Sequence, residues 1–241
     1  MVSLCALVVF SADVSHIPPG EKNFLLLQWQ TTLMDRFYSR KSKVKAKTKS
    51  TKESKVERAD SLRNAPLRDY CEWKSVSCVH GKVVRVDRTD RHDEVMDIHL
   101  LPPTVGDIHL TSCSLDYALH TRALPRALKY CYVNGNRLHG SVGLRTLPEH
   151  LVRLNLSRNR LVGPVDLTEL PRKLRTLDLW DNRIRQYVVF FGQLPPNLIY
   201  VEFHLIGGGN RIGELRGTST ENAKKLGKLF PGISLKHIHI E

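Results

Sequence analysis

The sequence predicts an α/β repeat fold: a solenoid with a curved parallel β-sheet on its concave side, a mostly irregular convex side and a helical N-terminal cap. The dipeptide Leu-Pro recurs at residues 101, 124, 147, 170 and 194, a period of 23 residues that stretches to 24 in the fourth unit. Within each unit the apolar residues keep fixed offsets, and two offsets differ by two residues, which is strand periodicity. Units this small cannot bury an apolar stripe alone, so they bury it by stacking over residues 101–217.

An asparagine follows the predicted strand at the same offset in three units. A strand that turns sharply leaves backbone amides and carbonyls inside the coil. A buried side-chain amide can satisfy them because it has both donors and an acceptor. In the first unit Cys113 occupies this offset. We therefore expect a structural ladder that runs along the stack and consists of Asn136, Asn159 and Asn182.

The repeated string L-P-x-x-L-x-x-L-x-L-x-x-N-x-L-x-G-x-V resembles the leucine-rich repeat (LRR) family and covers about half of the chain. The segments LHGSV (138–142) and LVGPV (161–165) are similar to the plant-type repeat. The whole string is similar to surface-antigen-type LRR proteins of kinetoplastid protists. This resemblance implies a protein-binding module.

The segment CEWKSVSC (71–78) resembles the N-terminal cap of plant receptor-type LRR proteins. The resemblance implies that Cys71 and Cys78 form a disulfide, that Trp73 packs on the first repeat and that a helix precedes them, here over residues 20–38. From the residues alone, two free thiols in a reduced cell remain possible. No second Cys/His pair stands at ligand spacing, so zinc is disfavoured.

The repeats at both ends of the array are irregular. In residues 61–100, which should hold the cap and an irregular first repeat, Arg88 stands where leucine belongs, and residues 87–94 should form an exposed loop. Residues 207–210 are extra relative to the repeat. Beyond them, residues 218–241 should contain a helix over 218–230 and a final repeat strand over 235–240, which either ends a truncated product or is shielded by the helix.

The net charge of +13 is unevenly distributed, because residues 40–58 hold nine basic and two acidic side chains. This stretch, Arg40 to Arg58, has no apolar face, so we expect a disordered insertion over 39–60. It could be a solvated linker, a weak contact for a polyanion or an anionic membrane, or a nuclear-localisation signal. The remainder shows no interleaving of aromatic and basic residues, so specific nucleic-acid recognition is not expected.

Residues 1–19 begin with a short apolar stretch and could be a weak signal segment. No apolar run is long enough for a transmembrane helix. The chain has no phosphate loop, G-x-S-x-G or H-E-x-x-H motif, so we expect no enzyme activity, no cofactor and no catalytic residue. His237 and His239 alternate beside a possible His204 column, but metal binding there is disfavoured.

Side chains that alternate with the inward leucines should line the concave face. Exposed Tyr, Trp and Arg residues are frequent hot spots of binding. We expect Tyr132 and Trp180 to flank Arg153 at the centre of this face. The candidate ligand-binding residues are His109, Tyr130, Tyr132, Arg153, Asn155, Asp178, Trp180, Tyr200 and Glu202.

Two functional hypotheses follow from these patterns. The first is a non-enzymatic recognition module, secreted or on the cell surface, that binds a protein or glycan through its concave sheet. The alternative is an intracellular LRR scaffold or adaptor with a basic tether to an anionic membrane or nucleic acid. The redox state of Cys71 and Cys78 separates the two, because disulfides persist in oxidising compartments.

Overall fold

The computed structural model describes residues 19–38, 69–90, 96–203, 209–218 and 223–240. The basic insertion (39–60) lies outside the described residues, and so does the expected signal segment (1–19) except for Pro19, where a helix begins. None of the described helices contains a stretch long and apolar enough to cross a bilayer.

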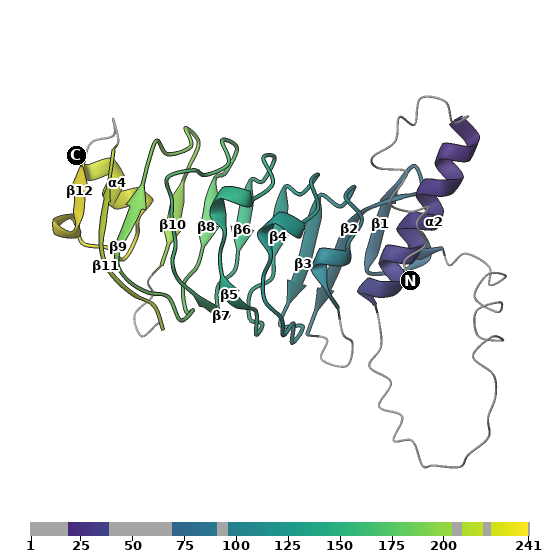
Figure 1. The fold of residues 1–241 in the computed structure, drawn as a ribbon, viewed down its shortest axis with the longest axis horizontal. Coiled ribbons are helices and arrows are strands. Elements are labelled where there is room, and N and C mark those ends of the chain that lie inside the picture. The colour runs from purple at the N-terminus through teal and green to yellow at the C-terminus, as the bar shows by residue number, and fades with distance from the viewer. Residues whose placement is uncertain (1–18, 39–68, 91–95, 204–208, 219–222, 241) are drawn as a thin grey trace, which may run out of the picture.

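A seven-stranded sheet runs along the long axis of the molecule (Figure 1). Its strands lie in the order β1-β2-β3-β4-β6-β8-β10, and all neighbours pair in parallel except the β1–β2 hairpin. One strand per coil on a shared sheet confirms the α/β repeat architecture. The strands are β1 (Val76–Val79), β2 (Lys82–Thr89), β3 (Asp107–Thr111), β4 (Tyr130–Tyr132), β6 (Arg153–Asn155), β8 (Thr176–Asp178) and β10 (Tyr200–Glu202).

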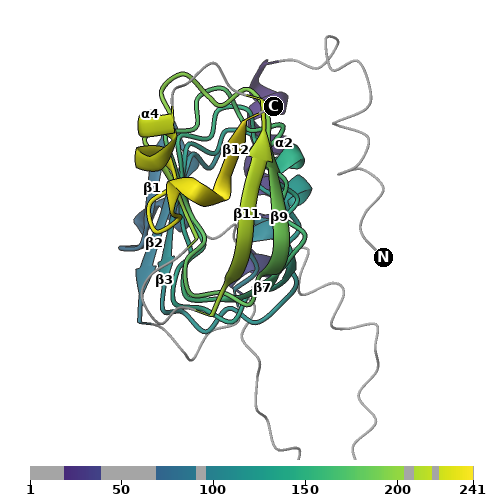
Figure 2. The ribbon, with the colours of Figure 1, turned by 90° about the vertical axis from the view of Figure 1, so that its left-hand side faces the viewer.

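The layer opposite the seven-stranded sheet was expected to be mostly irregular, but it contains 3₁₀ helices and strands (Figure 2). Short 3₁₀ helices such as Thr121–Ala123 and Leu144–Thr146 occupy the early coils. The run Tyr187–Phe191 is rich in β-branched and aromatic residues, which favour strands, and this layer becomes a parallel sheet there. Its strands are β5 (His139–Ser141) paired with β7 (Arg160–Val162), and β9 (Arg185–Phe191), β11 (Arg211–Gly217) and β12 (Ile238–Ile240) in one sheet.

The apolar core lies between the two layers and continues from coil to coil. Leu128, Leu151 and Leu174, which share one offset of the repeat, are all fully buried. Cys131 is also buried, with no disulfide partner, and its burial raises the pKa of the thiol to about 12. This thiol therefore fills the core and is not a reactive nucleophile.

A ladder of side-chain amides follows the core along one edge of the stack. The Oδ1 atom of Asn159 accepts a hydrogen bond from the Leu138 N–H (3.0 Å). Its Nδ2 atom donates to the carbonyls of Val133 and Leu156 (both 3.0 Å). Each ladder amide thus joins its own coil to the coil before it. The ladder asparagines are Asn136, Asn159, Asn182 and Asn210.

Asn210 was assigned to the extra residues 207–210, and that assignment is wrong. Its Oδ1 accepts from the Ile184 N–H (3.0 Å), and its Nδ2 donates to the carbonyls of Leu179 (2.7 Å) and Phe203 (2.9 Å). The sequence held the signal, because Asn-Arg-Ile at 210–212 repeats Asn-Arg-Ile at 182–184. The extra residues therefore precede the ladder position.

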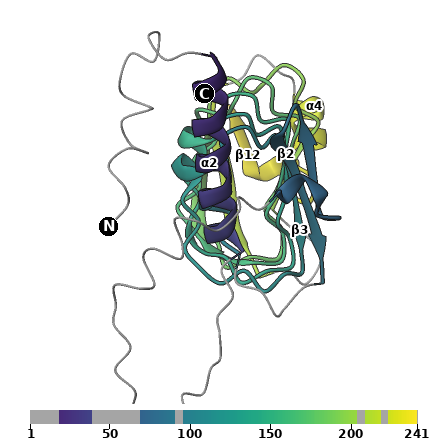
Figure 3. The ribbon, with the colours of Figure 1, turned by 90° about the vertical axis from the view of Figure 1, so that its right-hand side faces the viewer.

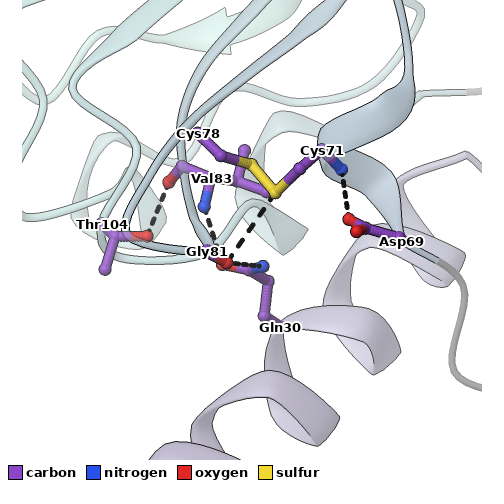
Figure 4. Close-up of a disulfide and its surroundings, with 7 residues drawn as sticks. All are labelled: Gln30, Asp69, Cys71, Cys78, Gly81, Val83 and Thr104. Carbon is purple, nitrogen blue, oxygen red and sulfur yellow. Dashed lines mark hydrogen bonds between the residues drawn. A yellow bond between two sulfur atoms is a disulfide. The ribbon is translucent and has the colours of Figure 1, made fainter.

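The N-terminal end is covered by α2 (Pro19–Phe37), which stands at the open end of the stack and contacts β2 and the 3₁₀ helix Ile98–Leu100 (Figure 3). Its residues Met34 and Phe37 are fully buried. Gln30 ties the helix to the hairpin: its Nε2 donates to the Gly81 carbonyl (3.0 Å) and its Oε1 accepts from the Val83 N–H (2.8 Å; Figure 4).

Cys71 and Cys78 form a disulfide beside this contact (Figure 4). Trp73, between the two cysteines in the sequence, packs against the rings of Tyr38 and Tyr70 at centroid distances of 4.9 and 4.8 Å. Trp73 therefore joins the disulfide segment to an aromatic cluster at the end of α2.

The expected loop over residues 87–94 is wrong at its start, because β2 continues to Thr89. Arg88 occupies the leucine position there. Its guanidinium lies over the Tyr38 ring (4.8 Å), and its Nε donates to the Ser75 Oγ (3.0 Å). Arg88 thus contacts an aromatic ring and a hydrogen-bond acceptor of the cap, where a leucine would contact an apolar neighbour. Residues 91–95 lie outside the described residues.

The C-terminal end also differs from the expected repeat strand. Within the described part of the expected helix, α4 spans Ala223–Leu229, and its residue Leu226 is fully buried. Residues 235–237 form a 3₁₀ helix, and only β12 is a strand. β12 pairs with β11 in the three-stranded sheet, so it does not extend the seven-stranded one. His237 and His239 therefore do not alternate on one strand.

Replacing Asn159 with alanine tests the ladder. Asn159→Ala leaves the Leu138 N–H without its acceptor inside the stack, and it removes one of the two side-chain donors from each of the Val133 and Leu156 carbonyls. We expect a loss of about 1–3 kcal/mol in the free energy of unfolding, because buried polar groups become unsatisfied. Urea denaturation followed by circular dichroism measures this loss. The control Asn197→Ala removes an exposed amide and should change the stability by less than about 0.5 kcal/mol. Equal stability of both variants would contradict the ladder.

Candidate ligand-binding face

The outward side chains of the seven-stranded sheet form two rows that run along the stack, here called the sheet face. This is the face that the sequence analysis expects to be concave. Strand register aligns each row, because residues at the same offset are direct neighbours on adjacent strands. The first row is Arg85, Asp107, Tyr130, Arg153, Thr176 and Tyr200. The second row is Asp87, His109, Tyr132, Asn155, Asp178 and Glu202.

The N-terminal end of the sheet face is an ion-pair network. The two Arg85 Nη atoms lie 2.6 Å from Asp87 and 2.6 Å from Asp107, and the hydrogen bond to Asp87 is the main cause that raises the pKa of Arg85. His109 Nε2 lies 2.8 Å from the other Asp107 oxygen. The sequence analysis missed Arg85, although it directly precedes the inward Val86. These charges compensate one another, so this end offers little net attraction for a ligand.

The expected central trio lies on the sheet face in a different arrangement. The Tyr132 ring packs against His109 at 4.5 Å, and Arg153 is exposed in the other row, level with Tyr130. Trp180 lies two residues beyond β8, and the guanidinium over its ring is that of Arg158 (5.4 Å). The structure therefore pairs Tyr132 with His109 and Trp180 with Arg158.

The C-terminal end of the sheet face is acidic. Asp178 was expected as an exposed contact residue, but it is only 7% exposed. Burial raises its pKa to about 6, and the neighbouring Glu202 adds to this, while a hydrogen bond from the Trp180 N–H opposes it. Glu202 lies directly beside Asp178 in register, and burial also raises the pKa of Glu202.

Within the described part of the chain, the acidic end has no compensating cation. Among the described residues, no Lys, Arg or His nitrogen lies within 4 Å of either carboxylate. Tyr200 borders the same end, and its pKa is raised by burial and by the charges of Asp178 and Glu202. A desolvated carboxylate pair favours a positively charged ligand group. Asn155, next to Asp178 on β6, binds Ser157 through its Oδ1 atom and is less free for contacts.

Across the described ranges, no three His, Cys, Asp or Glu side chains gather so as to hold a metal ion. Beyond the ion-pair network, the face offers aromatic rings, the exposed guanidinium of Arg153 and the two carboxylates of the acidic end, which are typical of a macromolecular contact surface.

No protein-family profile matches the chain, and no curated protein matches it. Among solved structures, it is similar to the LRR ectodomain of the plant membrane receptor kinase GASSHO1/SCHENGEN3 from Arabidopsis thaliana, in complex with CASPARIAN STRIP INTEGRITY FACTOR 2. The identity is 16% and the TM-score 0.51, over 88% of this chain and 26% of the ectodomain. The fold is LRR-like. The chain spans about a quarter of the ectodomain's length, and at this identity the likeness shows the fold alone.

Two further solved structures align with lower TM-scores. The BIR3–SERK2 complex of Arabidopsis thaliana shares 18% identity over 90% of this chain and 92% of its own, with a TM-score of 0.38. A plant ice-binding protein shares 16% identity over 69% of this chain and 77% of its own, with a TM-score of 0.31.

The raised pKa of Asp178 makes a prediction about stability. The folded state binds this proton more tightly than the unfolded state, whose aspartate has a pKa of about 3.9. The stability that this group contributes is therefore present below about pH 4 and is lost as the pH rises through about 6. Asp178→Asn should raise the melting temperature at neutral pH, and the difference from wild type should vanish in acid.

Thermal unfolding between about pH 3.5 and 7.5, which brackets both pKa values, measures this difference. The control Asp116→Asn replaces an exposed carboxylate and should follow the wild-type pH profile. An Asp178→Asn variant destabilised by the same amount at every pH would show that the side chain acts through its shape alone.

Proposed function

We propose that the protein is a non-enzymatic LRR recognition module that binds a protein or glycan partner through the sheet face. The observation that carries this proposal is the acidic end of that face, where Asp178 and Glu202 are partly desolvated and have no cationic neighbour among the described residues. A structural carboxylate pair would normally be compensated within the fold. A basic group on a partner would supply the missing compensation.

The aromatic residues of the face support the same proposal. Tyr132 and Tyr130 lie on one strand, and Tyr130 is 37% exposed. Tyrosine provides a large, rigid contact area at a low cost in side-chain entropy. Together with the exposed Arg153, these rings give a partner apolar contact beside the acidic end. The LRR ectodomain of similar fold was solved in complex with a factor. This supports a binding role for the architecture.

The Cys71–Cys78 disulfide supports a secreted or cell-surface location, because such bonds persist in oxidising compartments. It weighs against the intracellular scaffold, which requires both thiols to be reduced. We also infer a plant-receptor-type N-terminal cap, because α2, the disulfide and Trp73 form one unit at that end. Similarity to the surface-antigen-type repeats of kinetoplastid protists remains a prediction.

An affinity capture with matched variants tests the proposed face. Immobilised wild-type protein is compared with Tyr132→Ala/Trp180→Ala, which removes two rings from the sheet face. The control is Tyr187→Ala, which removes a ring that is 76% exposed on β9 in the opposite layer. We expect a partner that wild type and the control retain and that the double variant loses about tenfold or more, as for a hot-spot pair.

The partner recovered in this way is then titrated against Asp178→Asn and Glu202→Gln. If it uses the acidic end, both variants should weaken binding, since each removes one negative charge. Capture of the same molecules by all three proteins in the first experiment, or of none by wild type, would refute the sheet face as the binding surface.

A further inference from the structure

Every ladder asparagine is followed by an exposed arginine. The pattern occurs in four successive coils and extends over residues 136–211. The ladder explains the asparagine of each pair, because that amide is needed inside the coil. It does not explain the next residue, whose side chain points away from the core. The four exposed arginines, here called the arginine row, are Arg137, Arg160, Arg183 and Arg211.

Backbone hydrogen bonds hold the arginine row in register. The Arg160 N–H donates to the Leu138 carbonyl (2.8 Å), so it contacts the residue directly after Arg137. The Arg183 N–H repeats this contact with Leu161 (2.9 Å). The last arginine does the same with Ile184 (2.7 Å). One arginine per coil therefore lies along the edge where β7, β9 and β11 begin, the lower edge in Figure 1.

Three members of the row surround a single hollow. Arg137, Arg160 and Arg183 line a shallow hollow of about 400 Å³ together with Arg158. The carboxylate in its lining is that of Asp181, whose Oδ2 lies 3.9 Å from the Arg158 Nε. Among the described residues, no Asp or Glu oxygen lies within 4 Å of the guanidinium groups of the arginine row. The hollow therefore has a large excess of positive charge.

This arrangement is unfavourable for the protein alone. Adjacent strands are about 4.8 Å apart, which is shorter than the screening length of about 8 Å at physiological ionic strength. Like charges at this spacing repel one another across neighbouring strands. An anion between the guanidinium groups would remove the repulsion and accept their paired N–H donors.

We propose that the arginine row binds a sulfated polysaccharide, with its sulfate groups seated along the hollow. One cation per coil matches a linear polymer whose charges repeat, rather than a single small anion. Aromatic side chains, on which nucleic-acid bases would stack, are missing from the lining of the hollow. The disulfide favours an oxidising compartment, and sulfated glycans are the polyanions of the cell surface. The arginine row shares no residue with the two rows of the sheet face, so this site does not rest on the proposed function, although Arg158 in the hollow contacts the Trp180 ring.

A heparin-derived decasaccharide is a suitable probe for this site. Its affinity is measured by titration calorimetry on the full chain at several salt concentrations. The test variant is Arg137→Gln/Arg160→Gln/Arg183→Gln, and the control Arg122→Gln/Arg126→Gln/Arg172→Gln removes the same charge from exposed arginines outside the hollow. All variants keep Arg40 to Arg58, so any contribution of that stretch is common to them.

We expect the test variant to weaken heparin binding about tenfold or more and to reduce the dependence of log Kd on log salt, because fewer counterions are released. The control should weaken binding less than about threefold under the same conditions. A variant with lysine at the three test positions keeps the charge and loses the paired donors, so its affinity should fall between wild type and the glutamine variant.

Three outcomes would overturn the proposal. The first is no measurable heparin binding by wild type, and the second is an equal loss in the test and control variants. The third is tighter binding of single-stranded poly(dT) of equal charge, which would identify a nucleic-acid surface instead. Unchanged melting temperatures of the variants, measured alongside, exclude unfolding as the cause of any loss.

Discussion

The turn that ends each coil has to satisfy buried backbone groups without water, and the rest of the structure depends on how it does so. In each of the four coils from Asn136 to Asn210, one side-chain amide performs this role, with its oxygen bound to the preceding coil and its nitrogen to carbonyls of both coils. The leucine core could be built from many apolar residues with little loss. The amide position is stricter, because a donor and an acceptor are required together. This bond set therefore fixes the spacing and register of the coils.

Because the register is fixed, residues that recur once per coil form surfaces that run the length of the stack. Residues at one offset become neighbours across strands, so Asp178 meets Glu202 on the sheet face. The same register brings the arginine that follows each amide into a row along the edge of the stack. In such a fold each coil contributes its own side chains to the surface, and the ladder aligns these side chains along the stack. The two surfaces proposed above, one with an acidic end and one basic, can therefore share one framework without sharing residues.

Sequence patterns predicted the repeat and failed where coils meet the ends of the stack. Leu128, Leu151 and Leu174 could be placed because they share one offset and one role. Arg88 could not, since its neighbours Tyr38 and Ser75 come from distant segments. The strand signature at residues 235–240 is equally local, but α4 contacts β10 at the end of the seven-stranded sheet, and β12 pairs with β11 in the other layer. The face residues were located by alternation, whereas the burial of Asp178 depends on packing that no spacing reveals.

The charge on the sheet face is asymmetric in a way that bears on recognition. At its N-terminal end Arg85 is shared by two aspartates, so those carboxylates are already compensated and a ligand gains little from them. At the other end Asp178 is more deeply buried, and its hydrogen bonds come from the backbone N–H and the side chain of Trp180, neither of which carries a positive charge. A cation placed there gains attraction without breaking an existing pair, and it also relieves the repulsion with Glu202. Binding energy should therefore concentrate at the C-terminal end of the face, while the aromatic centre provides contact area. The ion pair of Arg85 with Asp107 at the N-terminal end joins β2 to β3.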